Sequence, residues 1–405
     1  MRILFADAFH PQYRDAVVDL GHECAFRPEL SADDLPGAIK GHDALIVRST
    51  RVTADTIDAA DDLGVIIRAG AGTNTIDRDA AAQRGIYVCN VPGRNSIAVA
   101  ELAFGLVLAL DRQIPDNVAD LRAGRWDKKR YSQAGGLFGR AVGVIGLGDI
   151  GLAFAERAAA FGMQVHAVAN PRRAPDVRAR ANRAGIVYVE DLAQLAGSCD
   201  ILSFHVPLND DTRGMIDRAF LAGVRPGTWI INTSRGEIVD DEALLEALDG
   251  KDLRAGLDVY NDEPTSSTGA FSSPLATHPN VYGTHHIGAS TEQAQRAIAA
   301  EVVAMLSDYA RGHVRNCVNI VVRALGSATL VVRHLDQVGV LSEVLEVVRQ
   351  HELNIEQMQN TIFAGRQAAV ATLQLSGTPP PDFAERLNAI PRVIHARVRP
   401  ADEQD

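Results

Sequence analysis

Residues 141–161 read AVGVIGLGDIGLAFAERAAAF, and this stretch decides the fold. An apolar run of strand character leads into the glycine-rich turn GLGDIG, and an Ala-rich helix follows. A lone GxGxxG is weak, but a strand before it and a helix after it are the context of a dinucleotide-binding turn. Gly146 permits the tight turn, Gly148 lets backbone approach a pyrophosphate, and Gly151 packs helix on strand. The stretch predicts a Rossmann-type dinucleotide site that also includes Asp149 and Ile150.

The pattern on either side of this turn is an alternation of short apolar runs and Ala-rich stretches. Before it, we expect strands at residues 3–8, 44–49 and 65–70, helices at 12–20, 54–60 and 78–84, and a long apolar helix at 96–110. From the turn onward, we expect strands at residues 141–146, 164–169, 200–206, 228–234 and 254–260. Such alternation is typical of parallel sheets with crossover helices, so it predicts two doubly wound α/β domains.

The character of the chain changes after residue 316. We expect strands at residues 329–335, 368–375 and 393–400, and helices at 340–351 and 383–388. This order indicates a small α+β module of ferredoxin-like topology. The predicted fold class is therefore α/β, with two doubly wound parallel-sheet domains and a C-terminal ferredoxin-like domain.

Composition excludes several classes of protein. Hydrophobic residues make up 46% of the 405 residues and charged residues 22%, with a net charge of -11. The sequence has no uninterrupted apolar run of about 18 residues, so it does not predict a membrane span. It also has no long cationic run, so it does not predict a nucleic-acid binder. The start, MRILFADAF, lacks the features of a signal peptide. We expect a cytoplasmic protein that binds neither membranes nor nucleic acid.

The four cysteines, Cys24, Cys89, Cys199 and Cys317, are far apart in sequence and show no CxxC spacing. This spacing predicts neither a disulfide framework nor a metal site. We interpret the cysteines as small apolar filling residues.

The second strand of the dinucleotide domain bears on the choice of cofactor. NAD sites usually place an acidic residue about 20 residues after the glycine turn, to bind the ribose 2'-hydroxyl. Here the chain has Asn170, Arg172 and Arg173 instead. Two guanidinium groups suit a 2'-phosphate, so the sequence favours NADP over NAD, although arginine is abundant throughout this chain.

Three later segments carry residues suited to moving a hydride and a proton. INTSRGEIVD (231–240) supplies Arg235, LDVYNDEP (257–264) supplies Glu263, and GTHHIGAST (283–291) supplies His286. Oxidation of a 2-hydroxy acid needs a cation for the carboxylate, an acid-base for the hydroxyl proton, and a carboxylate to hold that imidazole. Taken singly, each residue has a structural alternative. Arg235 could form a surface ion pair, Glu263 could belong to a Glu-Pro turn, and His286 could be a buried core histidine.

Together with the glycine turn, these segments resemble the D-isomer-specific 2-hydroxyacid dehydrogenase family, in the family's order along the whole chain. Within it, VRSTRVT (47–53), GAGTNTID (70–77), VPGRNSIAVAEL (91–102) and HIGASTEQAQ (286–295) are similar to the phosphoglycerate dehydrogenase branch. The resemblance implies that His286 is the acid-base, Glu263 its partner and Arg235 the substrate anchor. The implied reaction oxidises D-3-phosphoglycerate to 3-phosphohydroxypyruvate. His285 stands where the family usually has proline, so it remains the alternative histidine.

The resemblance also implies the remaining site residues and the domain order. Substrate would contact Arg48, Ser49, Gly72, Asn95 and Arg235; the nicotinamide would lie near Thr233, Asp258 and His286, and the adenosine near His205 and Pro207. The implied domains are a discontinuous flavodoxin-like substrate domain (1–94 and 289–316) and an inserted Rossmann domain (95–288). Arg48 could instead make a sheet-edge ion pair, and His205 could be a core residue.

The C-terminal module resembles an ACT domain through HLDQVGVL (334–341) and LNIEQM (353–358). The resemblance implies a linker at 317–325, a regulatory domain at 326–405, and an amino-acid effector, L-serine, bound between paired modules. The implied effector residues are His334, Asp336 and Asn354. Asp336 replaces an amide and Val338 a proline, so a purely structural pairing role stays open. We expect a homodimer or homotetramer, and Trp126 is similar to the family's subunit-contact tryptophan.

Two alternatives remain. One is a glyoxylate or hydroxypyruvate reductase of the same family, which a preference for NADP would suit. The other is a non-catalytic dinucleotide sensor or corepressor on the same fold, against which Arg235, Glu263 and His286 argue.

Overall fold

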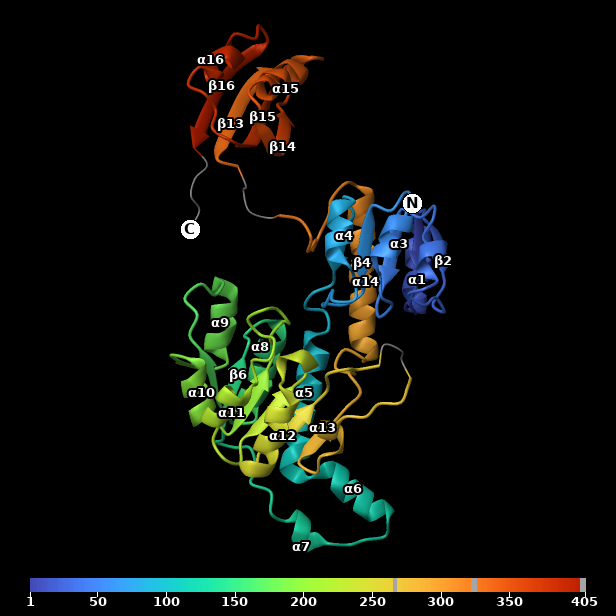
Figure 1. Ribbon diagram of the computed structural model, residues 1–405, viewed down its shortest axis with the longest axis vertical. Coiled ribbons are helices and arrows are strands. Elements are labelled where there is room, and N and C mark those ends of the chain that lie inside the picture. Colours follow the sequence, from blue (N-terminus) through green and yellow to red (C-terminus); the bar gives the residue numbers. More distant parts are fainter. Residues whose placement is uncertain (265–267, 322–325, 401–405) are drawn as a thin grey trace. The chain divides into compact units, whose positions relative to one another are not determined.

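The structure is a computed structural model that describes residues 1–264, 268–321 and 326–400. It divides into two compact units, Met1–Asn319 and Ile320–Asp405 (Figure 1). Residues 322–325 of the predicted linker and residues 401–405 of the predicted last domain lie outside the described residues.

The first unit begins with a parallel five-stranded sheet of order β2-β1-β3-β4-β5. Its strands are β1 (Arg2–Phe5), β2 (Glu23–Phe26), β3 (Ala44–Val47), β4 (Val65–Arg68) and β5 (Tyr87–Asn90). The helices with it are α1 (Pro11–Asp19), α2 (Leu35–Ala38), α3 (Ala54–Ala59), α4 (Arg78–Gln83) and α14 (Glu292–Ala310). α14 lies far along the chain, yet its Val302 and Leu306 share a buried cluster with Ile3 and Ile46 of the sheet.

A second parallel sheet of seven strands follows, in the order β12-β11-β10-β9-β6-β7-β8. Its strands are β6 (Ala141–Ile145), β7 (Gln164–Val168), β8 (Val187–Val189), β9 (Ile201–Phe204), β10 (Trp229–Asn232), β11 (Arg254–Leu257) and β12 (Val281–Gly283). Its helices are α5 (Ser96–Arg112), α6 (Ile114–Arg122), α7 (Lys128–Tyr131), α8 (Asp149–Ala160), α9 (Pro175–Arg183), α10 (Leu192–Ser198), α11 (Arg218–Gly223), α12 (Asp241–Gly250) and α13 (Pro274–Thr277), with a 3-10 turn at Gly236–Ile238.

Strand order positions the site in this second sheet. β6 lies between β7, the next strand in sequence, and β9, so the winding direction reverses at β6. In open parallel sheets, ligands bind beyond the carboxyl ends of the strands at such a switch point. The glycine turn follows β6 there, and His205 follows β9.

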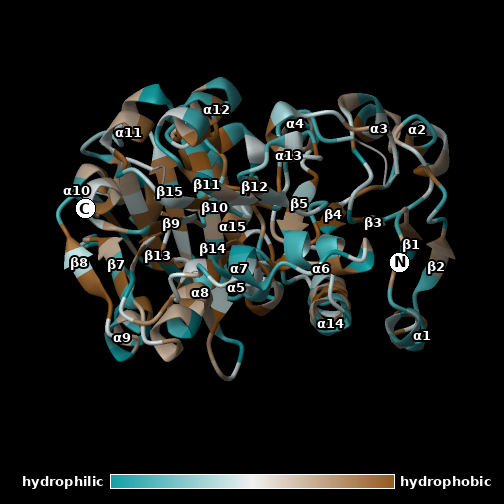
Figure 2. Cartoon of the chain, turned by 90° about the horizontal axis from the view of Figure 1, so that it is seen from below, coloured by the Kyte–Doolittle hydropathy of each residue, from teal (hydrophilic) through white to brown (hydrophobic). Residues whose placement is uncertain are grey.

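The strands of both parallel sheets are buried on two faces because helices cover each side. Consecutive residues of β1, such as Ile3 and Leu4, point to opposite faces of the sheet and belong to different apolar clusters. In the second sheet, Val144 and Ile145 of β6 separate in the same way. Figure 2 shows the hydrophobic colouring gathered along these strands. Two-sided burial explains why the strands are short, near-continuous apolar runs.

The second unit is a four-stranded antiparallel sheet of order β14-β15-β13-β16. Its elements are β13 (Ala328–Leu335), α15 (Val340–Gln350), β14 (Asn354–Ile362), β15 (Ala368–Ser376), α16 (Phe383–Asn388) and β16 (Val393–Pro400). Both helices contribute to one apolar cluster, with Val344 and Phe383 against Leu330 and Leu373. The order is the ferredoxin-like one, so the predicted fold class is confirmed.

The sequence patterns did not single out the strands β2, β5, β8, β12 and β14, nor the helices α2, α6, α7, α9 to α13 and α14. β14 is an edge strand whose residues are nearly all exposed, so it has no apolar alternation to reveal it. Of the predicted linker, Cys317 forms a β-bridge with Cys89 of β5.

Candidate functional site

The glycine turn has the geometry that its three glycines predict. Gly146 has φ of 94°, and a Cβ there would lie 2.3 Å from the His205 carbonyl oxygen. A Cβ on Gly151 would lie 1.9 Å from the carbonyl oxygen of Gly146. A Cβ on Gly148 would meet nothing within 4 Å. The first and third glycines are therefore required for packing, and the second leaves open space beside the backbone at the start of α8.

Three buried polar atoms near the glycine turn and the strand ends have no hydrogen-bond partner among the described residues: Asn95 Oδ1, Thr233 Oγ1 and His205 Nδ1. Buried polar groups are normally paired, so such orphans indicate a missing ligand. The His205 ring bonds to Ser203 Oγ through Nε2 at 2.9 Å and lies against Phe154. Burial lowers the pKa of His205 to about 3, so the ring is neutral. The open backbone at Gly148, the α8 N-terminus and these orphans together fit a dinucleotide.

The end of β7 is where the two arginines lie. The Arg172 backbone N–H donates to Asn170 Oδ1 at 3.0 Å, which closes a local turn. The Arg173 side chain bends back, donating to the Val168 carbonyl at 3.3 Å and lying over the Tyr188 ring. Arg172 is exposed, and no hydrogen bond or ion pair engages its guanidinium among the described residues. Of the two, only Arg172 is uncommitted.

His286 and Glu263 form a close pair. His286 Nδ1 lies 2.6 Å from Glu263 Oε2, and the other carboxylate oxygen accepts from the Tyr260 backbone N–H at 2.8 Å. Burial would raise the pKa of Glu263, but the hydrogen bond from His286 and the charges of His286 and Arg235 outweigh it and lower the pKa. An ionised carboxylate accepts a hydrogen bond from Nδ1–H, which leaves Nε2 as the free nitrogen. His285 is exposed and makes no such bond within the described chain.

Asp258, at the end of β11, holds the loop that carries His286. Its Oδ1 accepts from Thr284 Oγ1 at 2.6 Å and from the Ile287 N–H at 2.8 Å, and its Oδ2 accepts from the Gly288 N–H at 2.8 Å. The His286 N–H donates to the Asp258 carbonyl at 2.8 Å. His286 itself has φ of 51°, a left-handed conformation unusual for a residue with a side chain. The buried carboxylate therefore fixes the backbone that presents the imidazole.

The Arg235 turn is held by its neighbours. Asn232 accepts from the Ser234 N–H at 3.0 Å and donates to the Arg235 carbonyl at 2.8 Å. Gly236 is required, because a Cβ there would lie 2.1 Å from the Tyr260 backbone. The Arg235 guanidinium lies over Gly72, where an added Cβ would be 2.1 Å from Nη2. Arg235 of the second sheet thus meets the loop after β4 of the first.

A cluster of arginines is the feature that the sequence patterns missed. Arg68 ends β4, and its guanidinium lies over Gly70, where an added Cβ would be 1.7 Å from Nη1. Burial and the charges of Arg235 and Arg48 lower the pKa of Arg68 to about 10, and its Nε has no partner. Burial also lowers the pKa of Arg235. The sequence did carry a signal for Arg68, because this cation ends the apolar strand VIIR (65–68). Arg48 directly follows the apolar strand ALIV (44–47) in a similar way.

The other predicted substrate residues lie in the same region. Asp7 Oδ2 accepts from the backbone N–H groups of Arg48, Ser49 and Thr50 at 2.6, 3.1 and 3.0 Å, and so shapes the loop after β3. The Arg48 side chain donates to Gln295 Oε1 at 3.1 Å, not to an acid at the sheet edge. Pro207 is exposed in the loop after β9.

The predicted effector residues do not come together within one C-terminal module. His334 is buried, with Nδ1 at 2.8 Å from the Leu335 carbonyl and Nε2 at 3.2 Å from Asn360 Oδ1. On β15, His334 pairs with Ala369 and Asn354 with Ser376. Seven residues of strand separate these positions, about 23 Å at ~3.3 Å per residue. A site using both must therefore take them from different copies.

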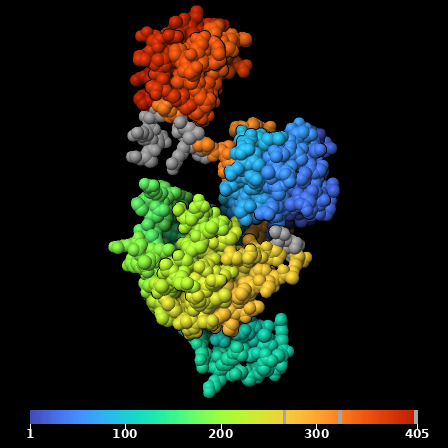
Figure 3. Space-filling model, viewed as in Figure 1, coloured from blue at the N-terminus to red at the C-terminus, as the bar shows by residue number. Residues whose placement is uncertain are grey.

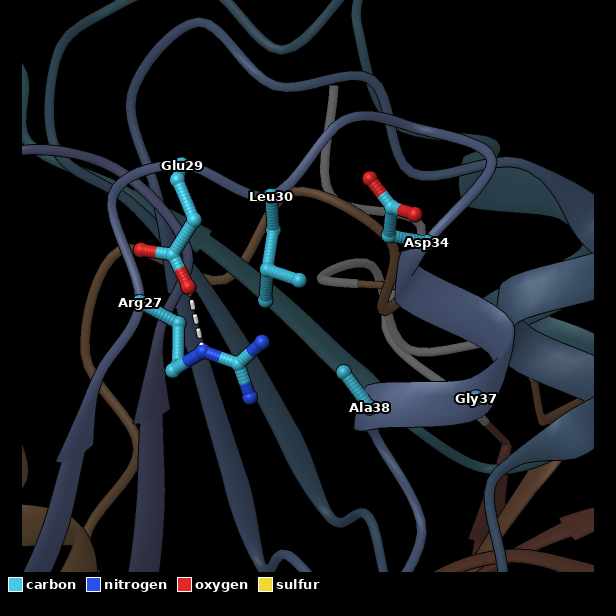
Figure 4. A pocket seen from close by; sticks show the side chains of 6 residues that line it. All are labelled: Arg27, Glu29, Leu30, Asp34, Gly37 and Ala38. Carbon is cyan, nitrogen blue, oxygen red and sulfur yellow. Dashed lines mark hydrogen bonds and ion pairs between the residues drawn. The ribbon is translucent and has the colours of Figure 1, made fainter.

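Two cavities are separate from these residues. One of about 430 Å³ lies between the end of β2 and α2, beside the Arg27–Glu29 ion pair (Figure 4). A second, of about 790 Å³, lies in the C-terminal unit along β16. Neither contains a predicted site residue.

Within residues 1–264, 268–321 and 326–400, no cluster of three His, Cys, Asp or Glu side chains is arranged to hold a metal. No helix among the described residues is long and apolar enough to cross a membrane.

The fold and the glycine turn define a dinucleotide-binding α/β protein, whose site combines an imidazole–carboxylate pair with a cluster of arginines. Residues 104–288 match the model of the D-isomer specific 2-hydroxyacid dehydrogenase NAD binding domain. A hydroxypyruvate reductase of Thermotoga maritima is 42% identical over 276 residues, covering 68% of this chain and 87% of the relative. The chain belongs to the D-isomer specific 2-hydroxyacid dehydrogenase family.

Other relatives extend this result. A D-3-phosphoglycerate dehydrogenase of Methanocaldococcus jannaschii is 40% identical over 323 residues, covering 79% of this chain and 60% of the relative. The chain thus spans about 60% of the length of that relative. A D-lactate dehydrogenase of Aquifex aeolicus, solved with NAD and lactic acid, has a TM-score of 0.67 at 25% identity, covering 77% and 96% of the chains. An acyclic imino acid reductase solved with NADPH and D-Arg has a TM-score of 0.69 at 25% identity, covering 78% and 100%.

Proposed function

We propose that this protein is a nicotinamide-dependent 2-hydroxyacid dehydrogenase that oxidises D-3-phosphoglycerate to 3-phosphohydroxypyruvate. The observation that carries the proposal is the 2.6 Å pair of His286 Nδ1 and Glu263 Oε2, within electrostatic reach of Arg235. An ionised carboxylate fixes the tautomer that leaves Nε2 free to take a hydroxyl proton. Arg235 supplies a desolvated cation for the substrate carboxylate.

The arginine cluster supports a substrate with a second anionic group. Arg235 has Glu237 and Glu263 nearby, whereas Arg68 interacts with two further cations and with Asp7. Desolvated cations close together are costly unless an anion is bound among them. One arginine suffices for a carboxylate, so Arg48 and Arg68 are suited to a phosphate. This reasoning favours a phosphorylated hydroxy acid over lactate or glyoxylate.

The remaining residues position these groups. When bound, the nicotinamide would supply the acceptor for the C2 hydride. Thr233 and Asn95 offer buried oxygens to bound ligands, and Asp258 holds the loop of His286. Ser49 and Gly72 belong to backbone loops beside the arginines. His205 and Pro207 follow β9 next to the glycine turn, where the adenosine side of a dinucleotide would lie.

NAD(H) binding follows from the family model, and the preference between NAD and NADP is the finer proposal. We propose that NADP is accepted at least as well as NAD. Arg172 supports this proposal, because its guanidinium at the end of β7 has no partner among the described residues. Asn170 stands where an NAD site usually has an acidic residue. Arg173 gives less support, because its guanidinium already bonds to the Val168 carbonyl.

A hydroxypyruvate or glyoxylate reductase is the second candidate, favoured by the Thermotoga maritima relative that aligns over 87% of its length. Arg48 and Arg68 argue against it, because hydroxypyruvate and glyoxylate carry a single anionic group. A non-catalytic sensor would not need the His286–Glu263 pair.

We propose that residues 1–94 and 289–316 form the substrate domain, residues 95–288 the nucleotide domain and residues 326–405 an ACT-type regulatory domain. The packing of α14 into the first core supports the discontinuous division. The proposed effector is L-serine, and the separation of His334 from Asn354 within one module means that a site using both would lie between two copies.

Self-association of the first unit is also proposed. The segment of α6 and α7 projects from the second sheet (Figure 3), with Leu121 and Trp126 exposed, the latter at 82%. Exposed large apolar side chains of this kind indicate an interface, and a homodimer or homotetramer would cover them.

The direct test is a spectrophotometric assay of the full chain with both nicotinamides. The substrates are 3-phosphohydroxypyruvate, hydroxypyruvate, glyoxylate and pyruvate. The proposal expects the highest kcat/KM for 3-phosphohydroxypyruvate. A higher value for hydroxypyruvate would establish the second candidate, and no turnover with any of them would favour the sensor.

A further inference from the structure

Cys89 and Cys317 lie opposite each other although 227 residues stand between them in sequence. Cys89 belongs to β5, and Cys317 belongs to the segment 316–319 that follows α14. The two residues form an antiparallel β-bridge. The Val318 N–H donates to the Val88 carbonyl at 2.8 Å, and the Asn90 N–H donates to the Asn316 carbonyl at 3.2 Å. Because the flanking residues make both bonds, Cys89 and Cys317 are a non-hydrogen-bonded pair.

This class of pair brings side chains close together. Opposite residues in such a position have Cα atoms about 4.5 Å apart, with both side chains on one face. Disulfides form where Cα atoms are about 4.4 to 6.8 Å apart. Cys317 is near enough to raise the pKa of the Cys89 thiol, although both cysteines are free. A disulfide therefore needs no large movement of the backbone.

The side chain of Asn319 also holds the segment in this register, and its Oδ1 accepts from the Cys317 thiol at 3.2 Å. Asn319 Oδ1 accepts from the Val88 N–H at 2.8 Å, and Asn319 Nδ2 donates to the Ile86 carbonyl at 2.8 Å. Cys89 is buried and Cys317 half-buried at the edge of the apolar cluster shared with α14. Cys317 is therefore the more exposed of the two cysteines.

We propose that Cys89 and Cys317 are a redox modification site, which a low-molecular-weight disulfide such as oxidised glutathione converts reversibly to an intramolecular disulfide. In the first step, the Cys317 thiolate attacks one glutathione sulfur, forms a mixed disulfide and releases one glutathione thiolate. In the second, the Cys89 thiolate attacks Cys317 Sγ and releases the other glutathione. Two protein thiols are oxidised, one glutathione disulfide is reduced to two thiols, and the two thiol protons pass to the released glutathione.

The order of attack follows from the surroundings of the two thiols. Burial and the neighbouring Cys317 raise the pKa of Cys89 to about 12, so Cys89 is a poor first nucleophile. Capping Cys317 in the mixed disulfide removes the charge of its thiolate, which had opposed ionisation of Cys89. The second step is still the slow one, and its rate rises with pH because the thiolate is the reactive form.

The disulfide would fasten the end of the first unit to β5. β5 leads directly into the segment 91–95 and α5, and the segment 316–319 ends the unit. A cross-link between residues so far apart in sequence restricts the unfolded chain strongly, so it stabilises the folded unit. Reduction removes that constraint and regenerates the Cys317 thiol, which donates to Asn319 Oδ1 at 3.2 Å in the reduced protein.

The experiment treats the full chain with oxidised glutathione, blocks the remaining thiols, and maps tryptic peptides without reduction. The proposal expects residues 85–94 joined to residues 316–323, with the loss of two hydrogen atoms. It also expects the thermal transition to rise by about 4 °C or more, reversibly with dithiothreitol. Cys317→Ser should abolish both effects. Cys24→Ser, which changes a half-buried cysteine on β2, should keep both.

Three outcomes would overturn the inference. They are glutathione stably attached to Cys317 without closure at pH 9, cross-links only between two chains, and an unchanged thermal transition after complete cross-linking. Cys89→Ala provides a separate check, because it should accumulate the mixed disulfide at Cys317. Failure of the 85–94 to 316–323 cross-link in a folded parent protein would exclude the site whatever Cys89→Ala does.

Discussion

Two histidines from the two units show how differently the same side chain is placed. His286 lies in a loop of the first unit, with a left-handed backbone, one ring nitrogen on Glu263 and a half-exposed side chain. His334 lies in β13 of the second unit, is buried, and has both ring nitrogens within hydrogen-bonding distance of protein atoms. The first has one ring nitrogen free, whereas both ring nitrogens of the second have partners within its own module.

The same contrast holds for the surroundings. In the first unit, several buried polar atoms lack partners among the described residues, and Arg68 lies close to Arg48 and Arg235, so this unit keeps groups that a ligand would satisfy. Sites of catalysis commonly retain such costly arrangements because the groups must be positioned before substrate arrives. The C-terminal module shows no such surplus at His334, and Asn354 is at the opposite end of its sheet. The proposed catalytic residues all lie in one unit, whereas the proposed effector site needs two copies.

The largest expected effect tests the chemical side of this contrast. His286→Ala should lower kcat by roughly 100-fold to 10,000-fold, as is typical for loss of a general acid-base. His285→Ala should change kcat less than about threefold, because His285 has no carboxylate partner. Steady-state kinetics with 3-phosphohydroxypyruvate is the measurement. The reverse order of effects would assign the acid-base role to His285.

Part of the candidate site around His286 could be predicted from the sequence, and part could not. The motifs located Arg235, Glu263 and His286, because each follows a strand end at the carboxyl edge of one parallel sheet. The motifs could not show that the Asp258 carboxylate accepts hydrogen bonds from the loop 284–288, because this depends on the backbone conformation at His286. Nor could they bring Arg68 to Arg235, which come from different sheets.

A second prediction concerns that cluster. Arg68→Gln should raise KM for the phosphorylated substrate by about 10-fold to 100-fold, the loss expected for one charge-assisted contact. KM for hydroxypyruvate should change less than about threefold, because it lacks the phosphate that Arg68 would bind. Arg51→Gln, at an exposed arginine of the VRSTRVT segment, is the matched control. Equal losses with both substrates would place the phosphate elsewhere.

A third prediction separates the two arginines after β7. Arg172→Ala should raise KM for NADP by about tenfold and leave NAD nearly unchanged, because only the 2'-phosphate contact is removed. Arg173→Ala should have a smaller effect, since its guanidinium bonds to the Val168 carbonyl and lies over Tyr188. Strict NAD dependence of the parent enzyme would contradict the proposal.

A fourth prediction uses the neutral ring beside the glycine turn. Burial lowers the pKa of His205 from 6.5 to about 3, so the unfolded chain takes up a proton below pH 6.5 that the folded unit does not. Stability therefore falls as pH falls from 6.5 toward 3, by at most about 1.4 kcal/mol per pH unit from this group. His205→Gln should flatten that slope in urea unfolding between pH 7 and 5. An unchanged slope would assign it to other histidines.

Strand prediction succeeded and failed for physical reasons as well. Two-sided burial makes β3, β4 and β9 continuous apolar runs that a sequence displays openly. β14 pairs through its backbone while exposing its side chains, so its sequence carries no apolar pattern.

The smallest expected effect concerns the second histidine. In the absence of amino acids, His334→Gln should leave kcat within about twofold of the parent, because the partners of its ring nitrogens, Leu335 and Asn360, belong to its own module. Calorimetry of the full chain with L-serine should show heat in the parent and less in His334→Gln. Asn354→Ala should lower the heat of L-serine binding equally if His334 and Asn354 meet across two copies. In the parent, L-serine binding should then increase with protein concentration as the copies associate. A large loss of basal turnover in His334→Gln would show that the two histidines are coupled through the fold, and no heat with any amino acid would leave the module a structural role.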